Sequence, residues 1–190
     1  CEQLARDRRL RYVHSGNEPL LIAGVGTIAL EILEDAPDVD VLIVPIGGGS
    51  GAAGACITAR AINPAIRVIG VQSEAAPAGY KSWKAGKLVE DKMETVAEGL
   101  ATRTAFELPQ RILRELLHDF VLVSDQEILR AVVTYLDRAH SLAEGAGAAS
   151  LAAAVKRRGE LEGKNVALIL SGGNITVDQL RNALEFKPLD

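Results

Sequence analysis

The stretch Val41-Leu42-Ile43-Val44-Pro45-Ile46-Gly47-Gly48-Gly49-Ser50-Gly51-Ala52-Ala53-Gly54 decides the fold. It begins with an uncharged run rich in β-branched residues, continues into glycines and ends in small residues that suit a helix. This order predicts a buried strand over Val41–Ile46, a tight turn, and a helix over Gly51–Ile62. Such a turn exposes successive backbone N–H groups at the positive end of a helix, so it can bind a phosphate without a basic side chain.

The same alternation of short apolar runs and helical patterns continues along the chain. Ser124 and Glu127 have the spacing of a capping box and mark a helix start. Strands that are nearly all apolar and alternate with helices are typical of an α/β fold with a mostly parallel, open sheet flanked by helices. The further strands that we predict are Arg67–Gln72, Phe120–Val123 and Asn165–Leu170, and the further helices are Pro109–Leu117, Asp125–Arg138 and Gly145–Arg158.

Composition excludes several classes of partner. The chain has 190 residues and a net charge of -4, and its basic residues are scattered, so no stripe exists to bind nucleic acid. The run Val41–Ala59 carries no charge, but the proline and glycines inside it favour strand, turn and helix over a membrane span. Cys1 and Cys56 lack the spacing of a metal or disulfide motif, which favours the cytoplasm, with Cys56 in the core.

The glycine turn is compatible with more than one kind of ligand. Gly49, Gly51 and Gly54 satisfy the pattern GxGxxG and Glu74 follows after twenty residues, as in a dinucleotide-binding, Rossmann-like module that need not be catalytic. Tight packing with no ligand is a second interpretation. The nucleoside-triphosphate P-loop is excluded because Ala55, not lysine, follows Gly54.

A second glycine turn favours a single cofactor. Ser171-Gly172-Gly173-Asn174 follows the last predicted strand. In an open α/β sheet, ligands gather at the carboxyl ends of strands, so two glycine turns at two such ends can face one cofactor.

Six motifs in one order carry a family resemblance. The chain resembles the fold-type II pyridoxal-phosphate enzymes, whose fold is tryptophan synthase β-like, and within them the serine/threonine dehydratases (threonine ammonia-lyases) and serine racemase. The stretch Ala101–Leu108 looks most like the threonine dehydratase branch. The motifs are Tyr12–His14, Ile22–Thr27, Val44–Gly54, Glu98–Ala101, Glu144–Ala149 and Ser171–Asn174.

The resemblance implies a domain organisation and a reaction. Residues 1–14 would be the end of a small domain, with His14 ending a strand, and residues 15–190 the C-terminal part of a large cofactor-binding domain, incomplete relative to the family. The reaction would be dehydration and deamination of L-threonine or L-serine to a 2-oxo acid and ammonia. Serine racemase-like activity is the alternative within the family, and a homo-oligomer is expected.

The resemblance also assigns cofactor-binding residues. The hydroxyl of Ser171, with Gly172 beside it, would meet the pyridine nitrogen, and Glu144 would lie near the ring. A neutral hydroxyl cannot stabilise a full pyridinium as a carboxylate would, which favours elimination over transamination. The phosphate of pyridoxal 5'-phosphate would be held by the backbone N–H groups of Gly47, Gly48, Gly49, Ser50 and Gly51.

The chain departs from the family pattern in three ways. Ser50 replaces a usual glycine of the phosphate loop. A divalent cation would be held by Glu74 and the carbonyl of Ala78, but Tyr80 stands where the family has an aspartate, so one carboxylate ligand is lost. The Ser-Phe-Lys and Ser-x-Asn-His motifs do not occur in this sequence.

The lysines of the chain do not replace the missing motif. All seven have the polar surroundings of surface charges, so no catalytic residue is assigned in this chain. We expect the Schiff-base lysine upstream, in an N-terminal portion of the same enzyme, and we expect this chain alone to be inactive. The lysines are Lys81, Lys84, Lys87, Lys92, Lys156, Lys164 and Lys187.

Overall fold

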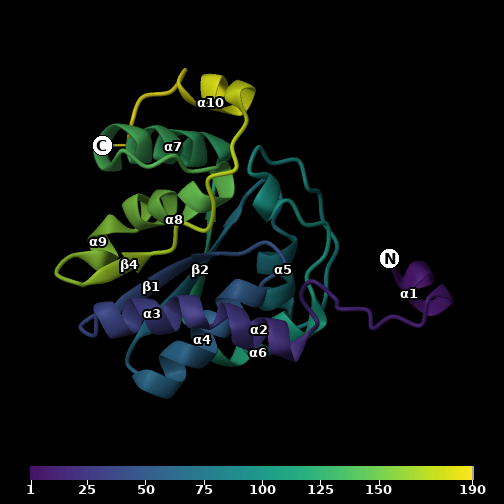
Figure 1. Ribbon diagram of the computed structural model, residues 1–190. Coiled ribbons are helices and arrows are strands. Elements are labelled where there is room, and N and C mark those ends of the chain that lie inside the picture. The colour runs from purple at the N-terminus through teal and green to yellow at the C-terminus, as the bar shows by residue number, and fades with distance from the viewer. Residues whose placement is uncertain (190) are drawn as a thin grey trace.

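A parallel sheet lies at the centre of the computed structural model, which describes residues 1–189 (Figure 1). Its strand order is β3-β2-β1-β4, and every neighbouring pair is parallel. Val41 pairs with Arg67 on one side and with Val166 on the other. The strands are β1 (Val41–Pro45), β2 (Arg67–Ser73), β3 (Asp119–Val123) and β4 (Val166–Leu168). The predicted parallel sheet flanked by helices is therefore confirmed.

Helices cover both faces of the sheet and bury a separate apolar cluster on each (Figure 1). One face is covered by α7 (Asp125–Ala139) and α8 (Gly145–Lys156), with α10 (Val177–Ala183) packed outside α7. The other face is covered by α3 (Thr27–Asp35), α4 (Ser50–Ile62) and α6 (Glu107–Leu116), with α2 (Pro19–Val25) against α4 and α5 (Ala78–Ala85) against α6. The short elements are α1 (Glu2–Asp7), η1 (Glu98–Leu100) and α9 (Arg158–Leu161).

The capping box predicted before α7 is present. Ser124 Oγ accepts a hydrogen bond from the Glu127 backbone N–H at 3.2 Å, and Glu127 Oε2 accepts one from the Ser124 N–H at 2.7 Å. These two bonds satisfy donors that a helix start otherwise leaves unpaired. They fix where α7 begins, directly after β3.

The strand that was expected to end at His14 is absent. The first fourteen residues contain α1, which buries none of its residues and lies away from the rest of the molecule, and they contain no strand (Figure 1). His14 ends no strand; its Nδ1 accepts hydrogen bonds from the N–H groups of Gly16 and Asn17 at 3.0 and 2.9 Å. A strand needs a neighbouring strand to satisfy its backbone, and residues 15–189 offer none here.

No helix formed by residues 1–189 has the length and apolar character to cross a membrane. The uncharged run Val41–Ala59 is divided between β1, the glycine turn and α4, as the sequence predicted.

Candidate functional site

The turn between β1 and α4 presents a row of backbone donors. Pro45 is the last residue of β1 and Gly49 is the N-cap of α4. The first N–H groups of a helix have no partner within it, and anions bind there with help from the helix dipole. No backbone oxygen of residues 1–189 accepts a hydrogen bond from the N–H groups of the five predicted phosphate-binding residues, Gly47, Gly48, Gly49, Ser50 and Gly51.

Neighbouring segments leave no room for side chains at the start of this turn. A Cβ atom on Gly47 would lie 2.2 Å from the carbonyl oxygen of Gly99. A Cβ atom on Gly48 would lie 2.5 Å from Cε2 of Phe106. Bare backbone is therefore required at both positions, and bare backbone is what a phosphate needs for close approach to N–H groups.

The surroundings require glycine at only two of the three positions of the GxGxxG pattern. Gly49 has a φ of 93°, in the left-handed region that glycine favours. A Cβ atom on Gly51 would meet nothing within 4 Å. A Cβ atom on Gly54 would lie 2.7 Å from the Ile22 carbonyl oxygen and 2.8 Å from the Gly26 nitrogen, so close packing of α4 on the junction of α2 and α3 explains that glycine.

Ser171 follows β4 at the same edge of the sheet. The backbone N–H of Ile169 donates to the carbonyl of Ile43 at 3.0 Å, which sets the register of β4 against β1. Ser171 lies two residues beyond Ile169 and Gly47 lies four residues beyond Ile43. Because β1 and β4 are parallel neighbours, both glycine turns leave the carboxyl edge of the sheet side by side.

Glu144 joins the two turns. It is the N-cap residue of α8, its side chain makes no capping hydrogen bond, and its N–H donates to the Gly172 carbonyl at 3.0 Å. A Cβ atom on Gly172 would lie 2.4 Å from Glu144 Oε1, and one on Gly99 would lie 3.7 Å from the same oxygen. Since Gly99 also contacts Gly47, the structure brings Gly47, Glu144 and Gly172 into one contiguous group.

Three residues beside this group, Gly99, Phe106 and Thr102, had no role assigned from the sequence. Gly99 and Phe106 contact the glycine turn, and Thr102 Oγ1 donates to the Gly47 carbonyl at 3.4 Å. Gln72, fully buried, donates from Nε2 to Thr102 Oγ1 at 3.5 Å. Gly99, Phe106 and Thr102 lie within stretches that carried the family resemblance. That resemblance was the one signal in the sequence that could have pointed to them.

The two proposed cation ligands lie at the end of β2 and the start of α5. Glu74 directly follows β2, and its Oε1 accepts a hydrogen bond from Lys156 Nζ at 3.2 Å. Lys156 also donates to Glu127 Oε2 at 3.1 Å. Burial opposes the charge on Lys156, but the hydrogen bonds that it donates to Glu127 and Glu74 outweigh burial and raise its pKa above the ordinary value.

Other side chains near this end of β2 pack in the apolar layer. The Tyr80 ring packs edge-on against Phe120, with ring centroids 5.6 Å apart, and so is occupied in packing. Ala78 is the first residue of α5. Within residues 1–189 no three or more His, Cys, Asp or Glu side chains gather in a way that could hold a metal ion.

The lysines lie on the surface, as predicted. Lys81 pairs with Asp91, and Lys84 Nζ lies 5.3 Å from the centre of the Tyr80 ring. All seven lysines are exposed.

Comparison with known proteins identifies the family. The pattern described as "Pyridoxal-phosphate dependent enzyme" matches residues 1–172. The chain belongs to this family. The family resemblance read from the sequence is therefore confirmed, and so is pyridoxal 5'-phosphate as the family's cofactor.

Curated relatives of this pyridoxal-phosphate family member include L-threonine ammonia-lyases. That of Thermotoga maritima is 40% identical over 171 residues, which cover 89% of this chain and 42% of the relative. That of Geobacter sulfurreducens is 42% identical over 185 residues, covering 96% of this chain and 46% of the relative. The chain thus spans about half the length of the curated relatives it matches.

Solved structures of the family share the fold. The processed form of threonine deaminase isoform 2 from Solanum lycopersicum matches with a TM-score of 0.92 at 28% identity, covering 97% of this chain and 55% of that one. Maize serine racemase matches with a TM-score of 0.87 at 30% identity, covering 97% and 59%. The fold expected from the resemblance, incomplete relative to the family, is confirmed.

Proposed function

We propose that this chain forms the cofactor-binding part of an enzyme that dehydrates and deaminates L-threonine or L-serine to a 2-oxo acid and ammonia. The rest of the enzyme, including the lysine that binds the cofactor covalently, lies in a portion outside this chain, and the chain alone is inactive. The cytoplasm is its compartment and a homo-oligomer its assembly. The names of the curated relatives support the reaction class.

One observation carries the proposal. Five successive N–H groups at Gly47 to Gly51 have no backbone acceptor, and they stand at the same sheet edge as Ser171, with Glu144 between the two turns. A phosphate at one turn and a ring nitrogen at the other require such an arrangement. The residues therefore fit pyridoxal 5'-phosphate, because the first turn supplies donors for an anion and the second supplies a neutral hydroxyl.

Each residue of the group has a distinct task in this proposal. The backbone N–H groups of Gly47 to Gly51 bind the phosphate, and the Ser50 hydroxyl adds a further donor. Ser171 donates its hydroxyl proton to the pyridine nitrogen, and Glu144 holds Gly172 and the ring edge in place. The bound cofactor supplies an electron sink for the bond that breaks at the substrate α-carbon.

The neutral partner at Ser171 favours elimination. A hydroxyl leaves the ring nitrogen uncharged, so the sink is weaker than one paired with a carboxylate. The electron pair left at the substrate α-carbon then forms the α,β double bond as the bond to the β-hydroxyl breaks. The hydroxyl takes up a proton and leaves as water before the α-carbon can be reprotonated. Serine racemase-like chemistry uses the same donors, and the likeness to maize serine racemase keeps it as the second candidate.

A divalent cation remains a separate proposal. Glu74 and the Ala78 carbonyl would supply two oxygen ligands, and the ion pair between Glu74 and Lys156 would have to open for the cation to enter. Calcium or magnesium added to the chain should raise its melting temperature if the site forms. No shift at millimolar cation would count against it.

Ligand discrimination tests the proposal. Pyridoxal 5'-phosphate should bind, observed by 31P NMR and calorimetry, and inorganic phosphate should compete with it. Pyridoxal, which lacks the phosphate, should bind at least about tenfold more weakly, because the charge-assisted hydrogen bonds of the turn are lost. Binding of NAD in preference to pyridoxal 5'-phosphate would support the dinucleotide module instead.

A further inference from the structure

A carboxylate outside the two glycine turns joins three separate segments of the chain. Asp125 is the first residue of α7, where the helix dipole favours a negative charge. Its Oδ1 accepts hydrogen bonds from the hydroxyls of Ser73 at 2.7 Å and Thr95 at 2.6 Å, and its Oδ2 accepts one from the Val96 N–H at 2.9 Å. Because Ser73 ends β2, these bonds hold residues 94–97 to the carboxyl edge of the sheet.

Both hydroxyls also accept a hydrogen bond from the backbone. Ser73 Oγ accepts one from the Ala75 N–H at 3.0 Å. Thr95 Oγ1 accepts one from the Ala97 N–H at 3.1 Å. Each hydroxyl has a single proton, which it donates to the carboxylate. With the backbone N–H bonded to Oδ2, three donors face two oxygen atoms, an arrangement that a carboxylate satisfies and that an amide, with one oxygen, does not.

Residues 94–97 lead directly to the segment that contacts the first glycine turn. Ala97 is fully buried and is the N-cap of η1, and its carbonyl accepts a hydrogen bond from the Leu100 N–H at 2.8 Å. Gly99 lies within this short helix, and its carbonyl oxygen would lie 2.2 Å from a Cβ atom on Gly47. A shift of residues 94–97 would therefore move Gly99 relative to the turn.

We infer that Asp125 is a positioning residue for the candidate site, because its carboxylate fixes residues 94–97 and so keeps the Gly99 carbonyl against Gly47. In this position Gly99 holds the first glycine turn in the conformation whose N–H groups bind the phosphate. Asp125 acts through Gly99 and not by contact with the cofactor. The inference rests on the proposed function, which assigns that phosphate to the turn.

The start of α7 supplies a matched control, since Asp125 also begins this helix. Ser124 is the N-cap residue, and its capping hydrogen bonds are made with Glu127 and not with residues 94–97. Ser124→Ala removes the cap and should lower the stability of the chain toward urea, as the loss of an N-cap does. It leaves the three hydrogen bonds of Asp125 in place.

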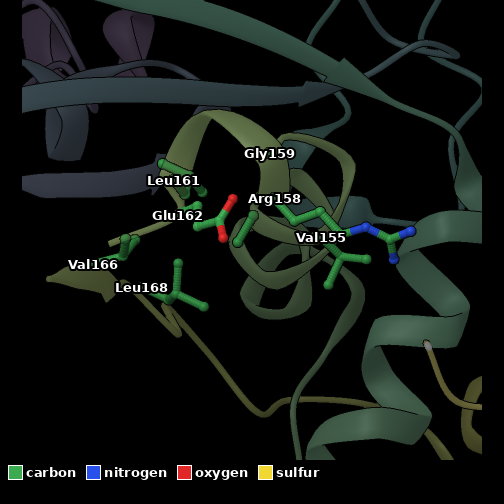
Figure 2. A pocket seen from close by; sticks show the side chains of 8 residues that line it. Val155, Arg158, Gly159, Leu161, Glu162, Val166 and Leu168 are labelled. Carbon is green, nitrogen blue, oxygen red and sulfur yellow. The ribbon is translucent and has the colours of Figure 1, made fainter. Parts of the chain in front are cut away.

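A second control lies beyond the far end of α8. Glu144, a residue of the candidate site, is the N-cap of α8, whereas Leu161 follows the C-terminal end of that helix. The 12 residues of α8 span about 18 Å. Leu161 lines an open hollow of about 670 Å³ beside β4 (Figure 2). Leu161→Ala should lower the stability of the chain without altering the glycine turns.

Two substitutions test the inference through the hydrogen bonds of Asp125. Asp125→Asn keeps the size of the side chain but turns an N–H₂ group toward one of the three donors. Thr95→Val removes one of the two hydroxyls. Each should raise the Kd for pyridoxal 5'-phosphate, measured by calorimetry, by at least about tenfold. Thr95→Ser keeps the hydroxyl and should restore the Kd of the wild type.

A second measurement needs no ligand. The Leu100 Cα would lie 3.8 Å from a Cβ atom on Gly47, so the α-protons of these two residues should give a nuclear Overhauser effect in the wild type. Asp125→Asn and Thr95→Val should weaken this effect. Ser124→Ala and Leu161→Ala should leave both the effect and the Kd unchanged.

The outcomes separate this inference from the proposed function. An unchanged Kd in Asp125→Asn overturns the inference, with or without a weaker Overhauser effect. A Kd that rises equally in Ser124→Ala or Leu161→Ala also overturns it, because general destabilisation then explains the rise. If Asp125→Asn does not fold, Thr95→Val decides by the same criteria.

Failure of the proposed function gives a different result. A wild-type chain that does not bind pyridoxal 5'-phosphate refutes the assignment of the phosphate to the turn, and the Overhauser effect then decides the inference alone. Its loss in Asp125→Asn but not in Ser124→Ala supports Asp125 as the residue that positions the turn. Its retention in Asp125→Asn overturns that role.

Discussion

Substitution of Gly47 by alanine tests the glycine turn most directly. The new Cβ would lie 2.2 Å from the Gly99 carbonyl oxygen, whereas ordinary contact begins at 3.4 Å. The obstacle is backbone, which cannot rotate away, so the turn has to retreat by about 1.2 Å. We expect a loss of about 1–3 kcal/mol in the free energy of unfolding, the usual cost of overpacking.

The same shift should weaken cofactor binding. A retreat of that size takes at least one N–H group beyond hydrogen-bonding distance of a phosphate oxygen. A hydrogen bond to a charged group contributes about 1.5–3 kcal/mol, which corresponds to a roughly 10- to 150-fold higher Kd for pyridoxal 5'-phosphate. Urea denaturation measures the first effect, and calorimetric titration or 31P NMR measures the second.

Gly24→Ala is the matched control. Gly24 is exposed within α2, and a Cβ there would meet nothing within 4 Å. Alanine should stabilise the chain by up to about 1 kcal/mol, because it suits a helix better than glycine, and it should leave the Kd unchanged. If Gly47→Ala bound the cofactor as tightly as the wild type, the turn would not be the phosphate site.

Three further substitutions test other parts of the structure. Phe106→Ala should cost about 2 kcal/mol in a urea titration, because its half-buried ring packs on Gly48 and on His14; a loss below about 0.5 kcal/mol would contradict this packing. Burial raises the pKa of Cys56 to about 12 from 9.0, so the folded state holds the proton more tightly and stability should fall as the pH rises from 9 toward 12. Cys56→Ala should flatten that fall, and an unchanged slope would argue against a buried thiol. Lys156→Met should cost less than about 1 kcal/mol, since its ion pairs are partly exposed. A loss well above about 1 kcal/mol in a urea titration would contradict this estimate.

The sheet was largely predictable from the sequence because each strand is marked by a short apolar run of neighbouring residues. Val41–Ile46 is uncharged, is followed by glycines, and forms β1 one residue shorter than predicted. The predicted strand Asn165–Leu170 shortened most, to Val166–Leu168, the three residues that pair in register with Val41 to Ile43 of β1. Helix α7 was also predictable, since its capping box is formed by Ser124 and Glu127, which are close together in the sequence.

Contacts between distant segments were not predictable. No periodicity indicates that Gly99 lies against Gly47 or that Phe106 fills the space beside Gly48, because these contacts depend on how a connecting segment crosses the end of the sheet. Helices α2 and α3 were also not predicted. Gly24 and Gly26 interrupt the helical pattern of these two segments in the sequence. The structure shows why position 26 is glycine, because it lies against Gly54 of α4.

The strand order has a consequence for the order of folding. Val41 pairs with Arg67, 26 residues later, and with Val166, 125 residues later. Closing the longer loop costs about 1.4 kcal/mol more in chain entropy, equivalent to roughly a tenfold lower encounter probability. We expect β1 and β2 to pair early and β4 to join them late. The glycine turn at Gly47 would then be in place before Ser171 arrives, so the residue proposed to meet the cofactor ring would be the last part of the proposed site to form.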